Sequence, residues 1–271
     1  MAGPRLDVAH RAFRDRRRAR FWWVLGSVLY CLAIVAAFPS MKGQQDINRI
    51  LQDYPPELLA LFAGGETTFD LASAADYLNS QLFALVAPLL LTILAIGFAA
   101  GTLAGEEERG TLDLVLSYPV TRASVVLQKA LVLVAEVVVL AAVIYLVTFG
   151  VGRAFGVALP LAEVAASGLG QVLLGVLFGL LALAAGAATG SRALAIGVGA
   201  GAAAATYLLG SLAPVVSWLE PFKWISPFYF ATGENPLANG LPWWRVLVLV
   251  GSAALFLGAA VAAFERRDLR G

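Results

Sequence analysis

The chain has 271 residues, of which 60% are hydrophobic and 14% are charged, and its mean hydropathy is +0.81. An ordinary globular protein is roughly 45–50% apolar and about 25% charged. Such a composition excludes a water-soluble protein. Six stretches are long enough for the roughly 20 apolar residues that a membrane-spanning helix needs. They take up about half of the chain and leave no room for a separate soluble domain of about 100–200 residues, which excludes a cytosolic enzyme and a nucleic-acid-binding module. We therefore expect residues 1–271 to form a single, all-α transmembrane domain.

Cysteine and histidine are too scarce for most site chemistry. Cys31 lies inside the first apolar stretch, and His10, the only histidine, precedes it. These counts exclude a disulfide framework, a thiolate metal cluster, a Ser–His protease and an H-E-x-x-H zinc protease. The sequence contains no Gly-Lys dipeptide, so it lacks the phosphate-binding loop of P-loop ATPases. We expect no catalytic residue, no metal site and no cofactor on this chain.

The apolar stretches and the basic residues together predict a topology. We expect spanning helices over residues 21–39, 80–104, 125–152, 164–190, 193–216 and 243–264. Tryptophans near the starts of the first and sixth spans are typical interfacial anchors. An even number of spans places both termini on one side. That side would hold 14 of the 19 basic residues, namely Arg5, Arg11, Arg14, Arg16, Arg17, Arg18, Arg20, Arg109, Arg122, Lys129, Arg192, Arg266, Arg267 and Arg270. The positive-inside rule then predicts a multi-pass protein of the inner (cytoplasmic) membrane with both termini in the cytoplasm.

The Arg-rich start, residues 1–20, favours a basic amphipathic helix on the inner leaflet. A cleavable signal is the competing interpretation. The apolar run that follows is longer than the usual 7–15-residue core of a signal peptide, and Phe38-Pro39-Ser40 is a poor cleavage site.

Two longer segments are expected on the outer side. In residues 40–79, apolar spacing predicts two short interfacial helices, the second starting at Pro56 and stopping at Gly64-Gly65. A lid that collects substrate is the alternative. Residues 217–242 hold six aromatic residues and are interrupted by Pro221, Pro227 and Pro236, which predicts a broken, partly re-entrant pair of short helices. The aromatics suit a membrane-interface belt or, alternatively, a drug-binding cluster.

The inner segment between the second and third spans, residues 105–124, is the most informative. At 100° per residue, Glu106, Arg109, Asp113 and Ser117 fall in one arc of roughly 80°, with an apolar flank on each side. This pattern predicts a short helix over residues 106–118, with acids in its first turn and Pro119 after it. One flank can pack on the bundle and the other can meet a partner; a helix without a partner is the alternative. We expect reversal of Glu107 and Glu108 to lysine to leave the bundle folded.

This segment resembles the inner loop of type-2 ABC transporter permeases, which work with separate ATPase subunits. The run Gly105-Glu106-Glu107-Glu108-Arg109-Gly110-Thr111-Leu112 and the following Ser117-Tyr118-Pro119-Val120-Thr121-Arg122 carry the resemblance. Six spans, a basic start, a long first outer segment and Ile225-Ser226-Pro227-Phe228 before the last span agree with it in architecture.

The resemblance implies that this segment is a coupling helix seated in a groove of the ATPase. The implied ATPase-coupling residues are Glu106, Glu107, Glu108, Arg109, Gly110, Thr111, Leu112, Asp113, Leu116, Pro119 and Arg122. It further implies two ATPase subunits, which bind ATP and Mg, and a second permease copy that is identical or related. Because relatives move drugs, peptides, lipids, glycans and ions, it does not identify the substrate.

Glu136 is the only acidic residue inside a predicted span, and we place it close to mid-membrane. Buried carboxyls in membranes are costly and are usually functional. The competing interpretation is a protonated glutamate that is hydrogen-bonded to a neighbouring helix. Glycines spaced by four, such as Gly175–Gly179 and Gly197–Gly201, permit close helix packing, including packing at a dimer seam.

The sequence therefore predicts the permease subunit of an ATP-driven ABC exporter, which forms the substrate pathway and performs no covalent chemistry. Two rivals belong to other classes. An ion- or proton-coupled secondary transporter would use Glu136 and would need discontinuous helices. A non-transporting membrane assembly factor would have no ATPase partner.

Overall fold

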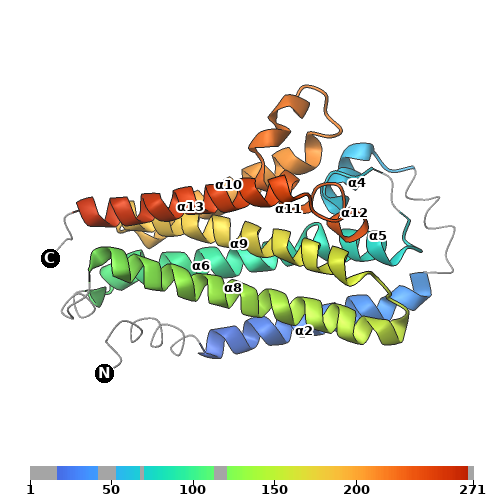
Figure 1. Cartoon of the computed structure of the whole chain (residues 1–271), viewed down its shortest axis with the longest axis horizontal. Coiled ribbons are helices and arrows are strands. Elements are labelled where there is room, and N and C mark those ends of the chain that lie inside the picture. Colours follow the sequence, from blue (N-terminus) through green and yellow to red (C-terminus); the bar gives the residue numbers. More distant parts are fainter. Residues whose placement is uncertain (1–16, 42–52, 68–69, 113–120, 268–271) are drawn as a thin grey trace.

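The computed structural model describes residues 17–41, 53–67, 70–112 and 121–267, and these residues form helices and connecting turns without strands. Six helical segments are long and apolar enough to cross a membrane, which confirms the predicted number of spans. The principal helices of these spans are α2 (Arg17–Met41), α6 (Val86–Glu108), α8 (Arg122–Gly152), α9 (Leu161–Thr189), α10 (Arg192–Leu212) and α13 (Trp243–Arg266). They form one elongated bundle (Figure 1).

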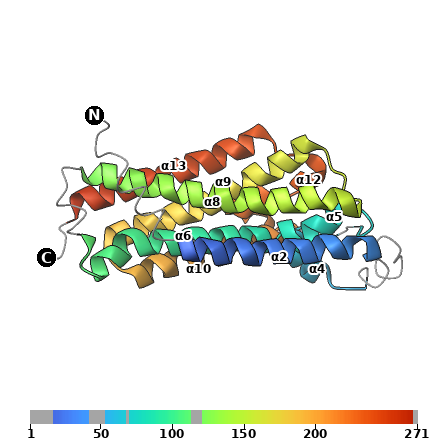
Figure 2. The same cartoon turned by 90° about the horizontal axis from the view of Figure 1, so that it is seen from below.

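The two ends of the bundle differ. Helices α6 and α13 end, and α8 and α10 begin, at the same end of the bundle, which we call the terminal end (Figures 1 and 2). The opposite, distal end carries short helices, namely α4 (Pro56–Ala63), α5 (Ala74–Leu78), the 3-10 helix η4 (Glu220–Ile225), α11 (Pro227–Thr232) and α12 (Pro236–Asn239).

At the distal end, α4 confirms the local prediction from Pro56 and Gly64. Pro56 is the first helical residue, where its missing N–H costs nothing, and Gly64 ends the helix at φ 69°. The other predicted short helix, around residues 46–51, lies outside the described residues. Residues 217–242 contain three short helices where a pair was predicted, and a proline lies in the first turn of each.

The second span differs from the single helix predicted over 80–104. It consists of α5, a π-helical turn η2 (Asn79–Phe83) and α6, with a break at Ala84 and Leu85. Pro88 supplies the physical reason. In a continuous helix its ring would clash with the Ala84 carbonyl four residues earlier, and it has no N–H to donate. The Gln171 side chain of α9 donates from Nε2 to the Phe83 carbonyl at 3.0 Å and so satisfies one backbone acceptor at the break.

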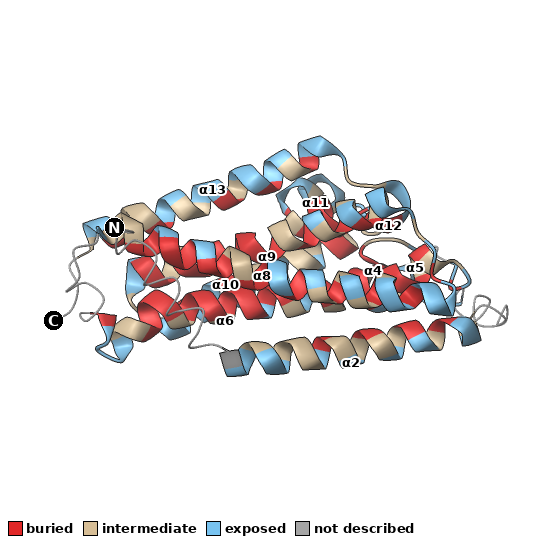
Figure 3. Ribbon diagram, turned by 60° about the horizontal axis from the view of Figure 1, so that its bottom comes forward, coloured by how far each residue is buried: buried red, intermediate tan, exposed pale blue. Residues whose placement is uncertain are grey.

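Helix α9 is the centre of the packing and contacts α6, α8, α10 and α13. Gly179 permits this close approach, because a Cβ atom there would lie 2.8 Å from Leu133 of α8 and 2.9 Å from Ala95 of α6. By contrast, Cβ atoms at Gly197 and Gly201 of α10 would meet nothing within 4 Å. Figure 3 shows the corresponding pattern, with buried residues concentrated in the inner helices and exposed faces on α2 and α13. Close packing of two copies of the chain through the glycines of α10 therefore stays a prediction.

Candidate functional site

The acidic run Glu106-Glu107-Glu108 ends α6, so the helix predicted over 106–118 does not begin with these acids; Leu112 is helical, and residues 113–118 lie outside the described residues. Carboxylates at a helix C-terminus oppose the helix dipole, so they need other partners. Since successive helical residues point about 100° apart, three adjacent side chains can reach three different neighbours.

Each glutamate of the run contacts a different helix. Both Glu106 carboxylate oxygens lie 2.6 Å from Lys129 Nζ on α8, and the Lys129 side chain is only 1% exposed. Glu107 forms an ion pair with Arg267 at the end of α13. Glu108 accepts a hydrogen bond of 2.8 Å from the backbone N–H of Arg192, in the first turn of α10. That last contact places a negative charge at a helix N-terminus, where the dipole favours it.

Arg267 extends this cluster to the remaining helices at the terminal end. Its guanidinium donates to the Ala187 carbonyl at 3.0 Å and thus puts a cation at the C-terminus of α9. Its own carbonyl accepts a bond of 2.7 Å from Arg122 at the start of α8. We call Glu106, Glu107, Glu108, Arg122, Lys129, Arg192 and Arg267 the terminal charge cluster. It ties α6, α8, α9, α10 and α13 together at one end of the bundle.

Gly190, which follows α9, is required by the packing of the cluster. Its φ is +65°, a conformation that side chains with a Cβ rarely adopt. A Cβ there would lie 2.6 Å from Arg267 Nη2 and 2.9 Å from both carboxylate oxygens of Glu107. Any larger residue would therefore disturb the Glu107–Arg267 pair.

Beyond the cluster, the chain reverses through a Schellman turn. The N–H of Thr111 donates to the Glu106 carbonyl and the N–H of Gly110 to the Glu107 carbonyl, both at 2.9 Å, with Gly110 at φ 66°. Residues Glu108–Thr111 are exposed, and we call them the terminal turn. Leu112 is 2% exposed and packs on the core, whereas Asp113, Leu116 and Pro119 lie outside the described residues. Gly110, two residues after the acidic run, was the sequence signal for this helix end.

Glu136 lies halfway along α8, and its side chain is 3% exposed. Its Oε1 is 2.9 Å from Arg20 Nη1. The sequence had assigned Arg20 to the basic segment before the first span, but α2 begins at Arg17. The start of α2 is level with the middle of α8 in both views, which brings the two charges together (Figures 1 and 2). Residues 1–16, where a basic amphipathic helix was predicted, lie outside the described residues.

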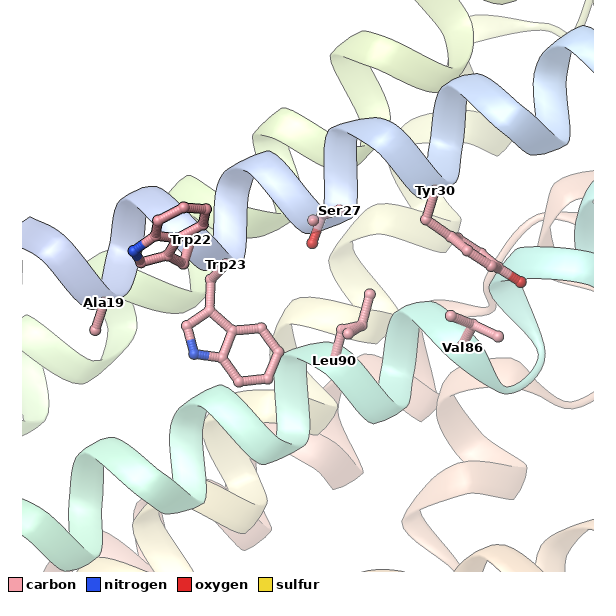
Figure 4. Close-up of a pocket in the computed structure, with 8 residues that line it drawn as sticks. Ala19, Trp22, Trp23, Ser27, Tyr30, Val86 and Leu90 are labelled. Atoms are coloured by element: carbon pink, nitrogen blue, oxygen red, sulfur yellow. The ribbon is translucent and has the colours of Figure 1, made fainter.

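A groove of about 520 Å³ separates α2 from α6 (Figure 4). Its lining is mostly apolar and includes Trp22, Trp23, Tyr30 and Leu90. Ser27 lies on the groove side of α2, and its hydroxyl is buried and has no hydrogen-bond partner in the part of the chain that the structure describes. The groove can take up apolar groups, and its aromatic lining was predicted only as an interfacial anchor.

No group of three or more histidine, cysteine, aspartate or glutamate side chains is placed to hold a metal ion within the described residues. Charge contacts join helices whose ends meet at an exposed turn. Six apolar spans and such an arrangement define a multi-pass membrane protein.

Comparison with known protein families shows which family of membrane proteins the chain belongs to. The family model described as "ABC-2 family transporter protein" matches residues 6–269, nearly the whole chain. The chain belongs to this family and is the membrane component of an ABC transporter, a component that is not itself catalytic. Members of this family typically work with ATPase partners. No curated protein matches the chain.

Proposed function

We propose that this chain is the permease subunit of an ATP-driven exporter, with its terminal end in the cytoplasm. The observation that carries the proposal is the exposed terminal turn, which is mounted directly on the terminal charge cluster. The excess of basic residues at this end supports the orientation.

The cluster explains how a force on the terminal turn would reach the spans. The three glutamates link the last turn of α6 to α8, α13 and α10 through short contacts. Breaking a buried ion pair by removing one partner costs about 3–5 kcal/mol. A displacement of the turn therefore moves these helix ends together, because separating them is costly.

In the proposed cycle, two ATPase subunits bind ATP and Mg, close on each other and push the terminal turn of each of two permease copies. The charge cluster passes this displacement to the spans, which switch the pathway between its inward-facing and outward-facing forms. A secondary transporter centred on Glu136 is less well supported, because Glu136 lies against the permanently cationic Arg20.

Partner binding is tested at exposed residues of the terminal turn. Charge reversal of Glu107 is unsuitable for this test, because it would break the internal ion pair with Arg267. The expectation from the sequence, that reversing Glu107 leaves the bundle unaffected, did not include this pair. Arg109→Glu changes an exposed residue at the end of α6. We expect this variant to reach the membrane at the normal level and to lose co-purification of the ATPase subunit.

The matched control is Arg153→Glu, which reverses an exposed arginine at the distal end of α8. This control should retain the ATPase. The proposal would be contradicted if Arg109→Glu and Arg153→Glu bound the ATPase equally well.

A further inference from the structure

The groove between α2 and α6 has no part in the proposed function. Helix α2 packs on α8 and leaves this groove of about 520 Å³ on the side of α6 (Figure 4). None of the eight described residues that line it is charged, and Trp22, Trp23, Val86 and Leu90 make its surface mostly apolar. Cavities of roughly 300–1,000 Å³ with such a lining typically bind small molecules. The groove is therefore a candidate binding site between two spanning helices.

The groove is about as long as the hydrocarbon of one membrane leaflet. On α2 it extends from Ala19 to Tyr30, which is about 16 Å at 1.5 Å per residue. Half of the roughly 30 Å hydrocarbon core of a bilayer is about 15 Å. The Tyr30 hydroxyl donates to the Gln81 carbonyl of η2 at 2.9 Å and so joins the two spans at the far end of the groove. An acyl chain that entered beside Ala19 would therefore reach as far as Tyr30.

Gly26 leaves room for such a chain. It lines the groove between Ala19 and Tyr30, and a Cβ atom at this position would meet nothing within 4 Å. A larger side chain at this position would therefore extend into the groove and would not collide with a neighbouring helix. The same open space makes Gly26 the position at which the groove can be filled by substitution.

The end of the groove at the start of α2 suits an anionic headgroup. Arg18 directly precedes the groove and is exposed. Trp22, four residues further on, lies on the same side of the helix and is 67% exposed. Tryptophan typically lies at the headgroup level of a membrane, and arginine attracts anionic lipids and binds phosphate. Arg20, by contrast, is engaged by Glu136. Arg18 is thus the basic side chain that is placed to meet a phosphate at this end.

We propose that the groove binds one acyl chain of an anionic phospholipid whose phosphate lies at Arg18. The chain contacts Trp22, Trp23 and Leu90 and passes over Gly26. Bound in this way, the lipid fills the space between α2 and α6 and joins the first span to the second. The site does not involve the terminal turn, so its test is independent of the ATPase contact.

Native mass spectrometry of the purified full chain tests this binding. The chain is incubated in detergent with palmitoyl-oleoyl phosphatidylglycerol, or with the phosphatidylcholine that carries the same acyl chains, and is then released from the micelle. We expect the wild type to retain one phosphatidylglycerol in preference to phosphatidylcholine, because only the former carries a net negative charge. Absence of this preference would overturn the proposal.

Three variants separate binding in the groove from general contact with lipid. Gly26→Leu should lose the retained lipid, since its side chain occupies the groove. The matched control is Gly251→Leu in α13, where the glycine is also exposed and its Cβ position is also open, and it should bind as the wild type does. Arg18→Gln should bind the two lipids equally. Equal retention of phosphatidylglycerol by Gly26→Leu and Gly251→Leu, or an undiminished preference in Arg18→Gln, would contradict the proposal.

A second measurement uses the wild-type chain and does not depend on the folding of a variant. A phosphatidylglycerol with a diazirine in its acyl chain is photoactivated in nanodiscs that contain the chain, and the adducts are mapped by peptide mass spectrometry. We expect the adducts to concentrate in residues 19–30 and 86–90. The exposed apolar stretch 247–255 of α13 reports general contact with lipid. Adduct yields in the groove no higher than in this stretch would overturn the proposal.

Discussion

At the scale of single residues, the Glu106–Lys129 pair explains how a lysine can lie in the bundle with only 1% of its side chain exposed. An unpaired buried charge is far more costly than the pair itself contributes. Gly190 is needed for a different reason: its backbone conformation and the limited space beside Glu107 both exclude a side chain. These residues make the terminal charge cluster possible, and each gives a prediction.

We expect Glu106→Ala to lower the free energy of unfolding by about 3–5 kcal/mol, because it leaves Lys129 without its carboxylate. Thermal unfolding of the purified chain in detergent measures the effect. Adding Lys129→Met should recover most of the loss. The pair would have no such role if the single and double variants were equally destabilised.

Gly190→Ala should also be destabilising, by about 1–2 kcal/mol for the left-handed conformation alone and further through the displaced Glu107 and Arg267 side chains. Gly251→Ala in α13 is the matched control, since a Cβ there meets nothing within 4 Å. Its melting temperature should equal or exceed that of the wild type. Equal melting temperatures for the two variants would contradict the packing around Gly190.

At the scale of elements, local signals in the sequence located most helices and missed features that depend on distant partners. Pro56 and Gly64 located α4 because a helix start and stop are local chemistry. The break before α6 was missed because Pro88 lies inside a continuous apolar run. The acidic run was assigned to a helix start because its partners, Lys129, Arg192 and Arg267, come from elsewhere in the chain.

The break in the second span depends on Gln171 of α9. We expect Gln171→Leu to destabilise the chain by about 1–3 kcal/mol, since the buried Phe83 carbonyl loses its side-chain donor. Hydrogen exchange of residues 79–89 should become faster, while exchange in α13 should not change. Unaltered exchange across the break would show that Gln171 does not support it.

At the scale of the whole molecule, the proposed function places the ATPase contact at the terminal end of the bundle. The long α8, about 46 Å at 1.5 Å per residue, exceeds the roughly 30 Å of membrane hydrocarbon. It therefore extends from the charge cluster towards the distal end of the bundle as one continuous helix. Glu136 and Arg20 join α2 to this element halfway along its length.

The orientation of the bundle gives a prediction that does not depend on the partner. A cysteine at Asn239, exposed at the distal end, should react with a membrane-impermeant thiol reagent in intact cells or spheroplasts. A cysteine at Thr111, exposed in the terminal turn, should react only after lysis. Asn235 would be a poor reporter because it is 2% exposed. The reverse labelling pattern would place the termini outside the cytoplasm.

The central claim is that the terminal turn is the surface on which an ATPase subunit acts. Photo-crosslinking in native membranes tests it most directly, with p-benzoylphenylalanine placed at Thr111 and, as a matched control, at Asn239. Both residues are exposed and lie at opposite ends of the bundle. We predict a covalent adduct with the ATPase subunit from Thr111 and none from Asn239. No adduct from Thr111 in membranes where the ATPase co-purifies with the chain, or equal adducts from both positions, would contradict the account.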